Sequence, residues 1–213
     1  MEHAKLKALN QFNEDNGWTW EILTTPFRNV RAMATSSNSL VNRLWVVPAG
    51  NVGPPEILYS DDRGVTWKSL PLPTGLPGLP TAIAAHPTDT QVLHAAGRTT
   101  LYSTRNGGET WTQRTFSGPI TSIAADATTV ALVTFTSQSR FAPPITELHW
   151  SDDGGETFPM VEELPFAPIA IVQIAFQPDL PGVILGLAAD GRGLRSTDGG
   201  RRGLADRVRS LCR

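Results

Sequence analysis

The stretch "SDDRGVTW", residues 60–67, decides the fold because its pattern returns along the chain. Residues 104–111 read TRNGGETW and residues 151–158 read SDDGGETF. A weaker copy, NEDNGWTW, lies at 13–20, and a shortened copy, STDGG, lies at 196–200. The third positions of the five copies are 47, 44, 47 and 45 residues apart. A constant period of this length is typical of solenoids and propellers.

The text between the copies predicts short strands. Each unit has an apolar run, a Pro/Asp turn, a second apolar run and a third run that enters the repeat, as in TAIAAHPTDTQVLHAAGRTTLYST at 81–104. TWKSLPL and TWTQRTF then read as fourth strands, and runs such as TVALVTF are too short and too rich in β-branched residues for helices. We therefore expect an all-β chain, a β-propeller of about four four-stranded antiparallel blades.

The repeated residues suit a hairpin turn between the third and fourth strands. Glycine tolerates a positive φ, and an Asp or Asn two residues earlier can accept hydrogen bonds from turn amides. Hydroxyl groups can add hydrogen bonds, and the final aromatic ring can fill the blade. An amide at Asn106 caps a turn but cannot serve as a catalytic carboxylate. The residues assigned to this structural role are Asp15; Ser60, Asp62, Gly64, Thr66 and Trp67; Thr104, Asn106, Gly108, Thr110 and Trp111; Ser151, Asp153, Gly155, Thr157 and Phe158; and Ser196, Asp198 and Gly200.

The pattern S-x-D-x-G-x-T-W/F resembles the Asp-box (BNR) repeat of the sialidase-like β-propeller superfamily, over residues 13–200. The resemblance implies the fold, and it implies that the boxes lie at the periphery, away from the ligand face. It says less about function, because the superfamily includes sialidases, xyloglucanases, sortilin-type receptors and photosystem II assembly factors.

An enzyme of this superfamily would need residues that the sequence does not offer clearly. A sialidase-like site would use an R-I-P stretch, an arginine triad and a Tyr/Glu pair. Here TPFRNVRAM has Arg28 and Arg31 without R-I-P, and Tyr59 and Tyr102 stand beside boxes, where packing explains them. A xyloglucanase-like inverting pair needs two carboxylates about 6.5–9.5 Å apart. The loop candidates for such a pair are Asp126, Glu147 and Asp190. We expect no catalytic residues; a glycoside hydrolase, or a fragment of one, is the alternative.

Arginines follow the second strand in three consecutive units: Arg98 in AAGRTT, Arg140 in SQSRFAPP and Arg192 in ADGRGL. In a propeller the loops between strands two and three emerge on the face opposite the boxes. Arginine forks suit carboxylate and phosphate groups. We therefore predict a binding or assembly scaffold that takes a protein, carbohydrate or other anionic ligand there, with Arg28 and Arg31 contributing. Unrelated solvated arginines are the alternative.

Composition limits the remaining possibilities. The 213 residues suit one domain or part of a larger one, and the net charge of −2 gives no electrostatic case for nucleic acid. Cys212 has no partner for an internal disulfide, and the sequence carries no cofactor or metal motif. The N-terminus lacks the apolar run of a signal peptide, and no stretch approaches the roughly 18 apolar residues of a membrane span. As written, the sequence predicts a cytoplasmic protein without a cofactor.

The repeat pattern ends near residue 200. We assign residues 1–200 to the propeller and 201–213, RRGLADRVRSLCR, to a basic tail outside the pattern. Two interpretations remain for the last unit. The propeller is incomplete, or the WTWEIL segment at 18–23 supplies the missing fourth strand and closes a ring of four blades. We favour the incomplete propeller.

Overall fold

The computed structural model describes residues 11–12, 19–20, 25–49, 56–72, 75–76, 78–137, 143–164, 170–177, 180 and 182–197. Within these ranges the regular elements are strands. The first two are β1 (Gln11–Phe12) and β2 (Thr19–Trp20). No helix of the described residues has the length and apolar character that crossing a membrane requires.

Four antiparallel sheets form the body of the protein. Blade 1 contains β3 (Asn29–Ser37), β4 (Asn42–Ala49), β5 (Glu56–Ser60) and β6 (Lys68–Pro71). Blade 2 contains β7 (Ala82–Ala85), β8 (Leu93–Ala96), β9 (Thr100–Thr104) and β10 (Thr112–Thr115). Blade 3 contains β11 (Ile120–Ala125), β12 (Val130–Thr136), β13 (Ile145–Ser151) and β14 (Met160–Glu163). Blade 4 contains β15 (Ile171–Phe176), β16 (Ile184–Ala188) and β17 (Gly193–Ser196).

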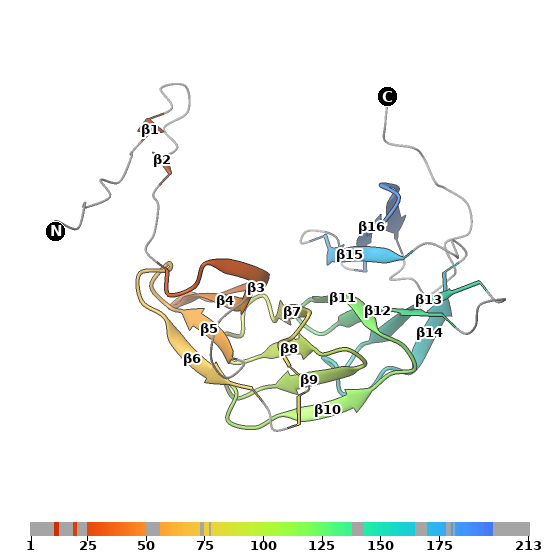
Figure 1. The fold of residues 1–213 in the computed structure, drawn as a ribbon, viewed down its shortest axis with the longest axis horizontal. Coiled ribbons are helices and arrows are strands. Elements are labelled where there is room, and N and C mark those ends of the chain that lie inside the picture. Colours follow the sequence, from red (N-terminus) through yellow and green to blue (C-terminus); the bar gives the residue numbers. More distant parts are fainter. Residues whose placement is uncertain are drawn as a thin grey trace.

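Each blade is a meander, because its strands pair in the order in which they follow one another. The first strands of neighbouring blades pack side by side, β3 with β7, β7 with β11 and β11 with β15. The sheets follow one another along an arc, with these first strands on its inner side (Figure 1). The prediction from the repeats is confirmed: the chain is all-β, and its four sheets are arranged as a four-bladed β-propeller.

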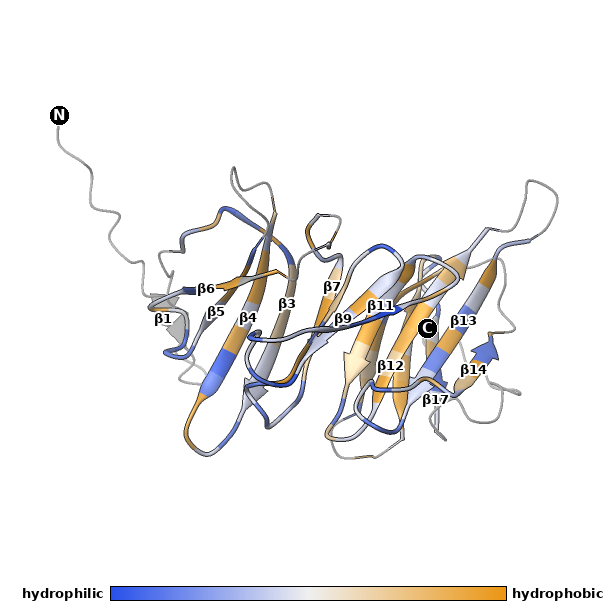
Figure 2. Cartoon of the chain, turned by 90° about the horizontal axis from the view of Figure 1, so that it is seen from below, coloured by the Kyte–Doolittle hydropathy of each residue, from blue (hydrophilic) through white to orange (hydrophobic). Residues whose placement is uncertain are grey.

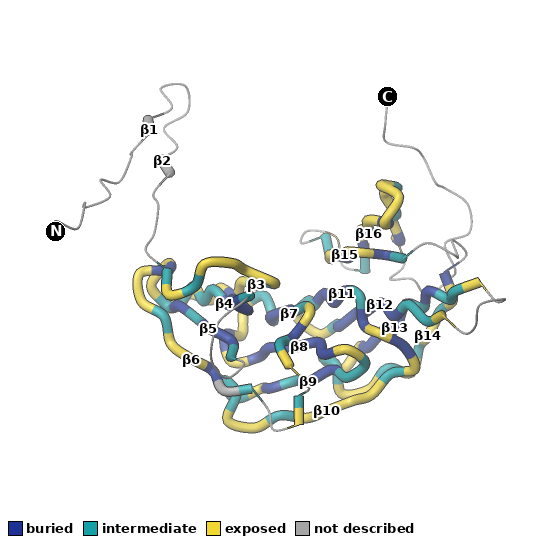
Figure 3. The backbone as a smooth tube through the Cα atoms, viewed as in Figure 1, coloured by how far each residue is buried: buried dark blue, intermediate teal, exposed yellow. Residues whose placement is uncertain are grey.

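Three apolar clusters hold the blades together. Trp45 and Val47 of blade 1 pack with Ile83 and Leu93 of blade 2. Equivalent clusters join blade 2 to blade 3 and blade 3 to blade 4. Central strands such as β12 are buried on both faces, and apolar residues concentrate in them (Figure 2). The outermost strand β10 is exposed throughout (Figure 3). The core of the protein therefore lies between the blades.

The proposed closure of the ring by the WTWEIL segment is not what the structure shows. Thr19 and Trp20 form β2, which pairs with β1, while β17 ends the described part of blade 4. Pairing with a strand a few residues away closes a much shorter loop, and so costs less chain entropy, than pairing with β17. The rest of that segment and the tail at 201–213 lie outside the described residues.

Candidate functional site

The turn at 60–67 is built around the side chains of Ser60 and Asp62. Ser60 Oγ accepts a hydrogen bond from the amide of Gly64 at 2.7 Å and donates to Asp62 at 2.8 Å. Asp62 also accepts from the amide and the hydroxyl of Thr66, at 2.8 and 2.5 Å. Gly64 has a φ of 88°, which a side chain would strain. Hydrogen bonds between its own residues therefore hold this turn.

The other two described boxes repeat this arrangement, with one hydrogen bond reversed in the second box. Asn106 accepts from Thr104 and from the amide of Thr110, and its amide group donates to the Thr110 hydroxyl. Asp153 accepts from Ser151 at 2.6 Å and from both the amide and the hydroxyl of Thr157. The remaining box positions Asp15, Asp198 and Gly200 lie outside the described residues, while Ser196 ends β17 and is buried.

These hydrogen bonds fix the charge of the box carboxylates. Those from Thr66, together with one from Ser60, lower the pKa of Asp62 to about 2. Those from Ser151 and Thr157 hold the pKa of Asp153 well below its usual range. Both groups stay ionised near neutral pH and act as hydrogen-bond acceptors. They are poorly suited to donate a proton to a substrate.

The aromatic ring after each box is half-buried, whereas the sequence predicted a buried ring that fills the blade. Trp67 donates to the Gly64 carbonyl and meets Phe27 edge-on at 4.9 Å. Trp111 and Phe158 pack against the edges of the clusters between the blades. The aromatic residue comes just before the outermost strand of its blade, so its ring is only partly covered.

Arginines at the box end tie neighbouring blades together. Arg43 donates two hydrogen bonds to the Asp61 carboxylate, at 2.6 and 3.0 Å, and a third to the Thr90 carbonyl of blade 2 at 2.8 Å. Arg105 of blade 2 donates to backbone carbonyls of the third box and lies 3.3 Å from Glu156. Sequence reasoning missed both bridges. Because these side chains and the box residues are engaged within the fold, the box end is a structural face.

The predicted arginines of the loops lie at the opposite end of the blades. Strands two and three are joined there, so Arg98 between β8 and β9 shares this end with Arg192 between β16 and β17. Arg28 and Arg31 stand at the start of β3, which begins at the same end. Arg140 lies outside the described residues.

The four described arginines differ in whether they form an ion pair. Arg192 is paired with Asp190, with 2.6 Å between Nε and Oδ2. In contrast, the ion pairs found among the described residues include none with Arg28, Arg31 or Arg98, which are all exposed. The loop of Arg98 is nevertheless fixed, since its carbonyl accepts from the amide of Ile120 at 2.8 Å. Within the described part of the chain, the exposed arginines of this end that lack an ion pair therefore belong to blades 1 and 2.

The carboxylates considered for glycoside hydrolysis do not gather at one place. Asp126 follows β11 at the box end, whereas Asp190 follows β16 at the opposite end. Glu147 is not a loop residue as the sequence suggested: it lies on β13, because pairing with β12 continues to Ile145. Its carboxylate contacts the hydroxyls of Ser117 and Thr134 at 3.2 and 3.3 Å and is 3.5 Å from His149 Nε2.

The two tyrosines have packing partners. Tyr102 is buried and donates to the Gly75 carbonyl at 3.3 Å, and Tyr59 contacts the Trp45 ring and the Arg43 guanidinium. Across the part of the chain that the structure describes, no three His, Cys, Asp or Glu side chains gather as a metal site would require. Among the described residues, Arg28, Arg31, Arg98 and Arg192 thus lie at the end opposite the boxes, and Asp126 lies at the other end of the blades from Asp190.

The box turns and meander blades define a BNR-repeat β-propeller. Residues 7–141, more than half of the chain, match the family described as "Photosynthesis system II assembly factor YCF48". The chain belongs to this family. No curated protein matches its sequence.

Among solved structures, the chain is 18% identical to YCF48 bound to D1 peptide, covering 81% of this chain and 64% of that one with a TM-score of 0.41. It is 12% identical to Saccharomyces cerevisiae Sqt1, covering 91% and 53% with a TM-score of 0.62. It is 17% identical to the Neurospora crassa Pan2 WD40 domain, covering 86% and 54% with a TM-score of 0.52. The chain thus spans less than two thirds of each of these structures.

Proposed function

We propose that this protein is a non-catalytic assembly scaffold of photosystem II that binds an acidic segment of a protein partner at the end opposite the Asp boxes. Membership of the YCF48 family is the observation that carries the proposal. A protein of that name has been solved with D1 peptide bound. The link to it here is the shared family, not the structural likeness.

The free arginines support the location of the binding face. Arg28, Arg31 and Arg98 are exposed on blades 1 and 2. Their charges are available to an incoming carboxylate, whereas Arg43 and Arg105 at the box end are already engaged. Arg192 contributes less, because Asp190 already offsets its charge. A peptide that carries a free C-terminus or acidic side chains fits such a face through charge-assisted hydrogen bonds.

Binding of a fluorescent D1 peptide to the purified protein, followed by anisotropy, tests the proposal. Arg98→Ala should weaken the affinity about tenfold, since one charge-assisted hydrogen bond contributes about 1.5–3 kcal/mol before solvent screening. The double variant Arg28→Ala/Arg31→Ala should weaken it as well. Affinity should also fall with rising salt, because the contacts are exposed.

Arg63 at the box end provides the matched control. It is exposed and has a φ of 63°, so Arg63→Asn removes a charge while keeping a residue that tolerates this conformation. This variant should bind D1 peptide like the unaltered protein. An equal loss of affinity in Arg63→Asn and Arg98→Ala would contradict the assigned face, and an absence of peptide binding by the unaltered protein would contradict the proposed partner.

A further inference from the structure

The turn that carries Arg98 is hydrogen-bonded to the connection between blades 2 and 3, residues 116–119 together with the start of β11. The carbonyl of Thr99 accepts a hydrogen bond from the amide of Phe116 at 2.8 Å. The carbonyl of Arg98 accepts one from the amide of Ile120, also at 2.8 Å. Because both residues of the turn are held through their backbone, the direction in which the Arg98 side chain leaves the turn depends on where the connection lies.

The connection is in turn anchored on blade 3. Phe116 packs against the apolar cluster between blades 2 and 3, and the carbonyl of Pro119 accepts a hydrogen bond from the amide of Phe135 at 3.0 Å. Between these two anchors, the exposed hydroxyl of Ser117 donates to Glu147 Oε2 at 3.2 Å. The carboxylate of Glu147 therefore fixes the part of the connection that lies between the apolar anchor and the backbone anchor.

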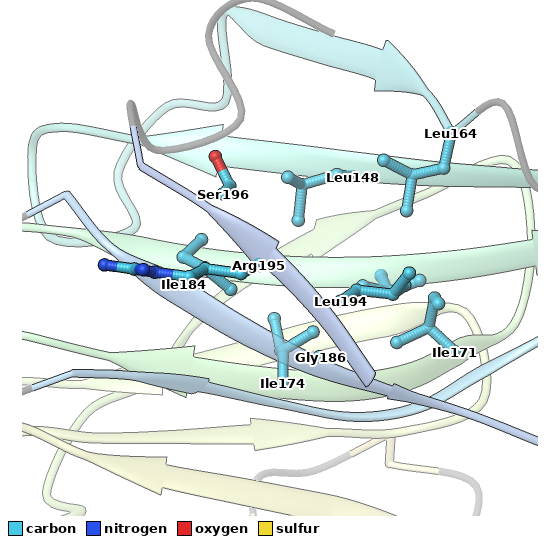
Figure 4. Close-up of a pocket in the computed structure, with 10 residues that line it drawn as sticks. Leu148, Leu164, Ile171, Ile174, Ile184, Gly186, Leu194, Arg195 and Ser196 are labelled. Atoms are coloured by element: carbon cyan, nitrogen blue, oxygen red, sulfur yellow. The ribbon is translucent and has the colours of Figure 1, made fainter. Parts of the chain in front are cut away.

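The alternation of side chains along β13 directs Glu147 toward the connection. Leu148 lines the apolar pocket between blades 3 and 4 (Figure 4). Successive side chains of a strand point to opposite faces, so Glu147 and His149 point toward blade 2. There Glu147 Oε2 also accepts from the Thr134 hydroxyl at 3.3 Å and lies 3.5 Å from His149 Nε2. These contacts hold the same oxygen that Ser117 reaches.

We propose that Glu147 is a positioning residue of the binding face: Glu147 holds Ser117, the connection holds the turn at 98–99, and Arg98 is thereby presented to the partner. This inference rests on the proposed function, in which Arg98 binds an acidic segment. The negative charge of Glu147 repels such a segment. Glu147 thus has two effects of opposite sign on affinity: its charge weakens binding, and its hydrogen bond to Ser117 strengthens it.

Anisotropy of the fluorescent D1 peptide separates the two effects. Glu147→Ala removes both the charge and the acceptor, and it should weaken affinity about three- to fivefold, the factor that one hydrogen bond of modest strength allows. Glu147→Gln removes the charge and keeps an oxygen that can accept from Ser117, so its affinity should equal or slightly exceed that of the unaltered protein. Ser117→Ala removes the donor at an exposed position and should reproduce the loss seen in Glu147→Ala.

Glu163→Ala is the matched control. Glu163 pairs with Glu147 across β13 and β14 and is exposed, so this change removes a neighbouring carboxylate while Ser117 keeps its acceptor. This variant should bind the peptide at least as tightly as the unaltered protein. The double variant Arg98→Ala/Glu147→Ala should bind like Arg98→Ala alone, because Glu147 acts through Arg98. Equal affinities of Glu147→Ala and Glu147→Gln, or additive losses in the double variant, would overturn the inference.

Hydrogen exchange of the protein without peptide tests the same inference independently of binding. The amides of Phe116 and Ile120 should exchange faster in Glu147→Ala and in Ser117→Ala, and at unaltered rates in Glu147→Gln. Unaltered exchange in both alanine variants would overturn the inference. If the unaltered protein binds no D1 peptide, the proposed function fails, while the exchange rates still decide whether Glu147 positions the turn. If Glu147→Ala does not fold, Ser117→Ala serves for both measurements.

Discussion

The capping role of the box carboxylate can be measured at Asp153. In the third box this carboxylate accepts three hydrogen bonds, from the hydroxyl of Ser151 and from the amide and hydroxyl of Thr157. Asp153→Ala removes all three, whereas Asp153→Asn leaves a side chain of the same shape. The second box already shows what an amide can do there, since Asn106 keeps the equivalent contacts with Thr104 and Thr110.

The expected magnitudes follow from these contacts. A hydrogen bond contributes about 0.5–1.5 kcal/mol net, and the exposed position of the turn favours the lower values. Asp153→Ala should therefore lower the free energy of unfolding by about 2 kcal/mol. Asp153→Asn should cost about 1 kcal/mol or less, because the amide oxygen and nitrogen can serve as acceptor and donor as they do in Asn106.

Urea unfolding followed by tryptophan fluorescence measures both variants. Glu109→Ala is the control, because it removes an exposed carboxylate from a box turn without removing the cap. Its unfolding midpoint should match that of the unaltered protein. Equal losses for Asp153→Ala and Asp153→Asn would refute the capping argument, since they would show that the negative charge matters rather than the hydrogen-bond geometry.

Three further changes test the packing of the blades. Burial lowers the pKa of His94 to about 4, below its usual value near 6.5. The neutral imidazole therefore leaves the protein fully stable above pH 6.5, and about 3 kcal/mol of the free energy of unfolding is lost as the pH falls to 4. His94→Asn should flatten the dependence of the urea midpoint on pH across this interval. Arg43→Met should cost about 2–3 kcal/mol in urea unfolding, because it leaves the partners of the blade bridge unpaired. Gly108 and Gly75 share a φ of +92°, but a Cβ at Gly108 would collide with Leu70 while Gly75 has open space. Gly108→Ala should thus lower the free energy of unfolding by roughly 1–3 kcal/mol more than Gly75→Ala does, which a lower melting temperature would show.

The blades could be predicted from the sequence because their turns are determined by residues close together in the chain. The capping residues of a box lie within eight positions of one another, so their types and spacing determine the hairpin without help from the rest of the fold. Once the hairpins were located, the order of the strands followed, and so did the end of the blade at which Arg98 lies. The ion pair of Arg192 had a local signal too, because Asp190 precedes it by two residues across a glycine.

Contacts between blades could not be predicted from residue types at short spacing. Arg43 meets Asp61 18 residues away and Thr90 47 residues away, and both contacts depend on how two sheets pack. The half-burial of Trp67 likewise depends on its position directly before the outermost strand β6.

Hydrogen exchange of the protein with and without D1 peptide tests the binding face most directly. The arginine-bearing end should gain protection, in residues 97–99 and 28–31, while the box turns at 60–67, 104–111 and 151–158 keep their exchange rates. Protection confined to the box turns would contradict the assignment of binding to the opposite end.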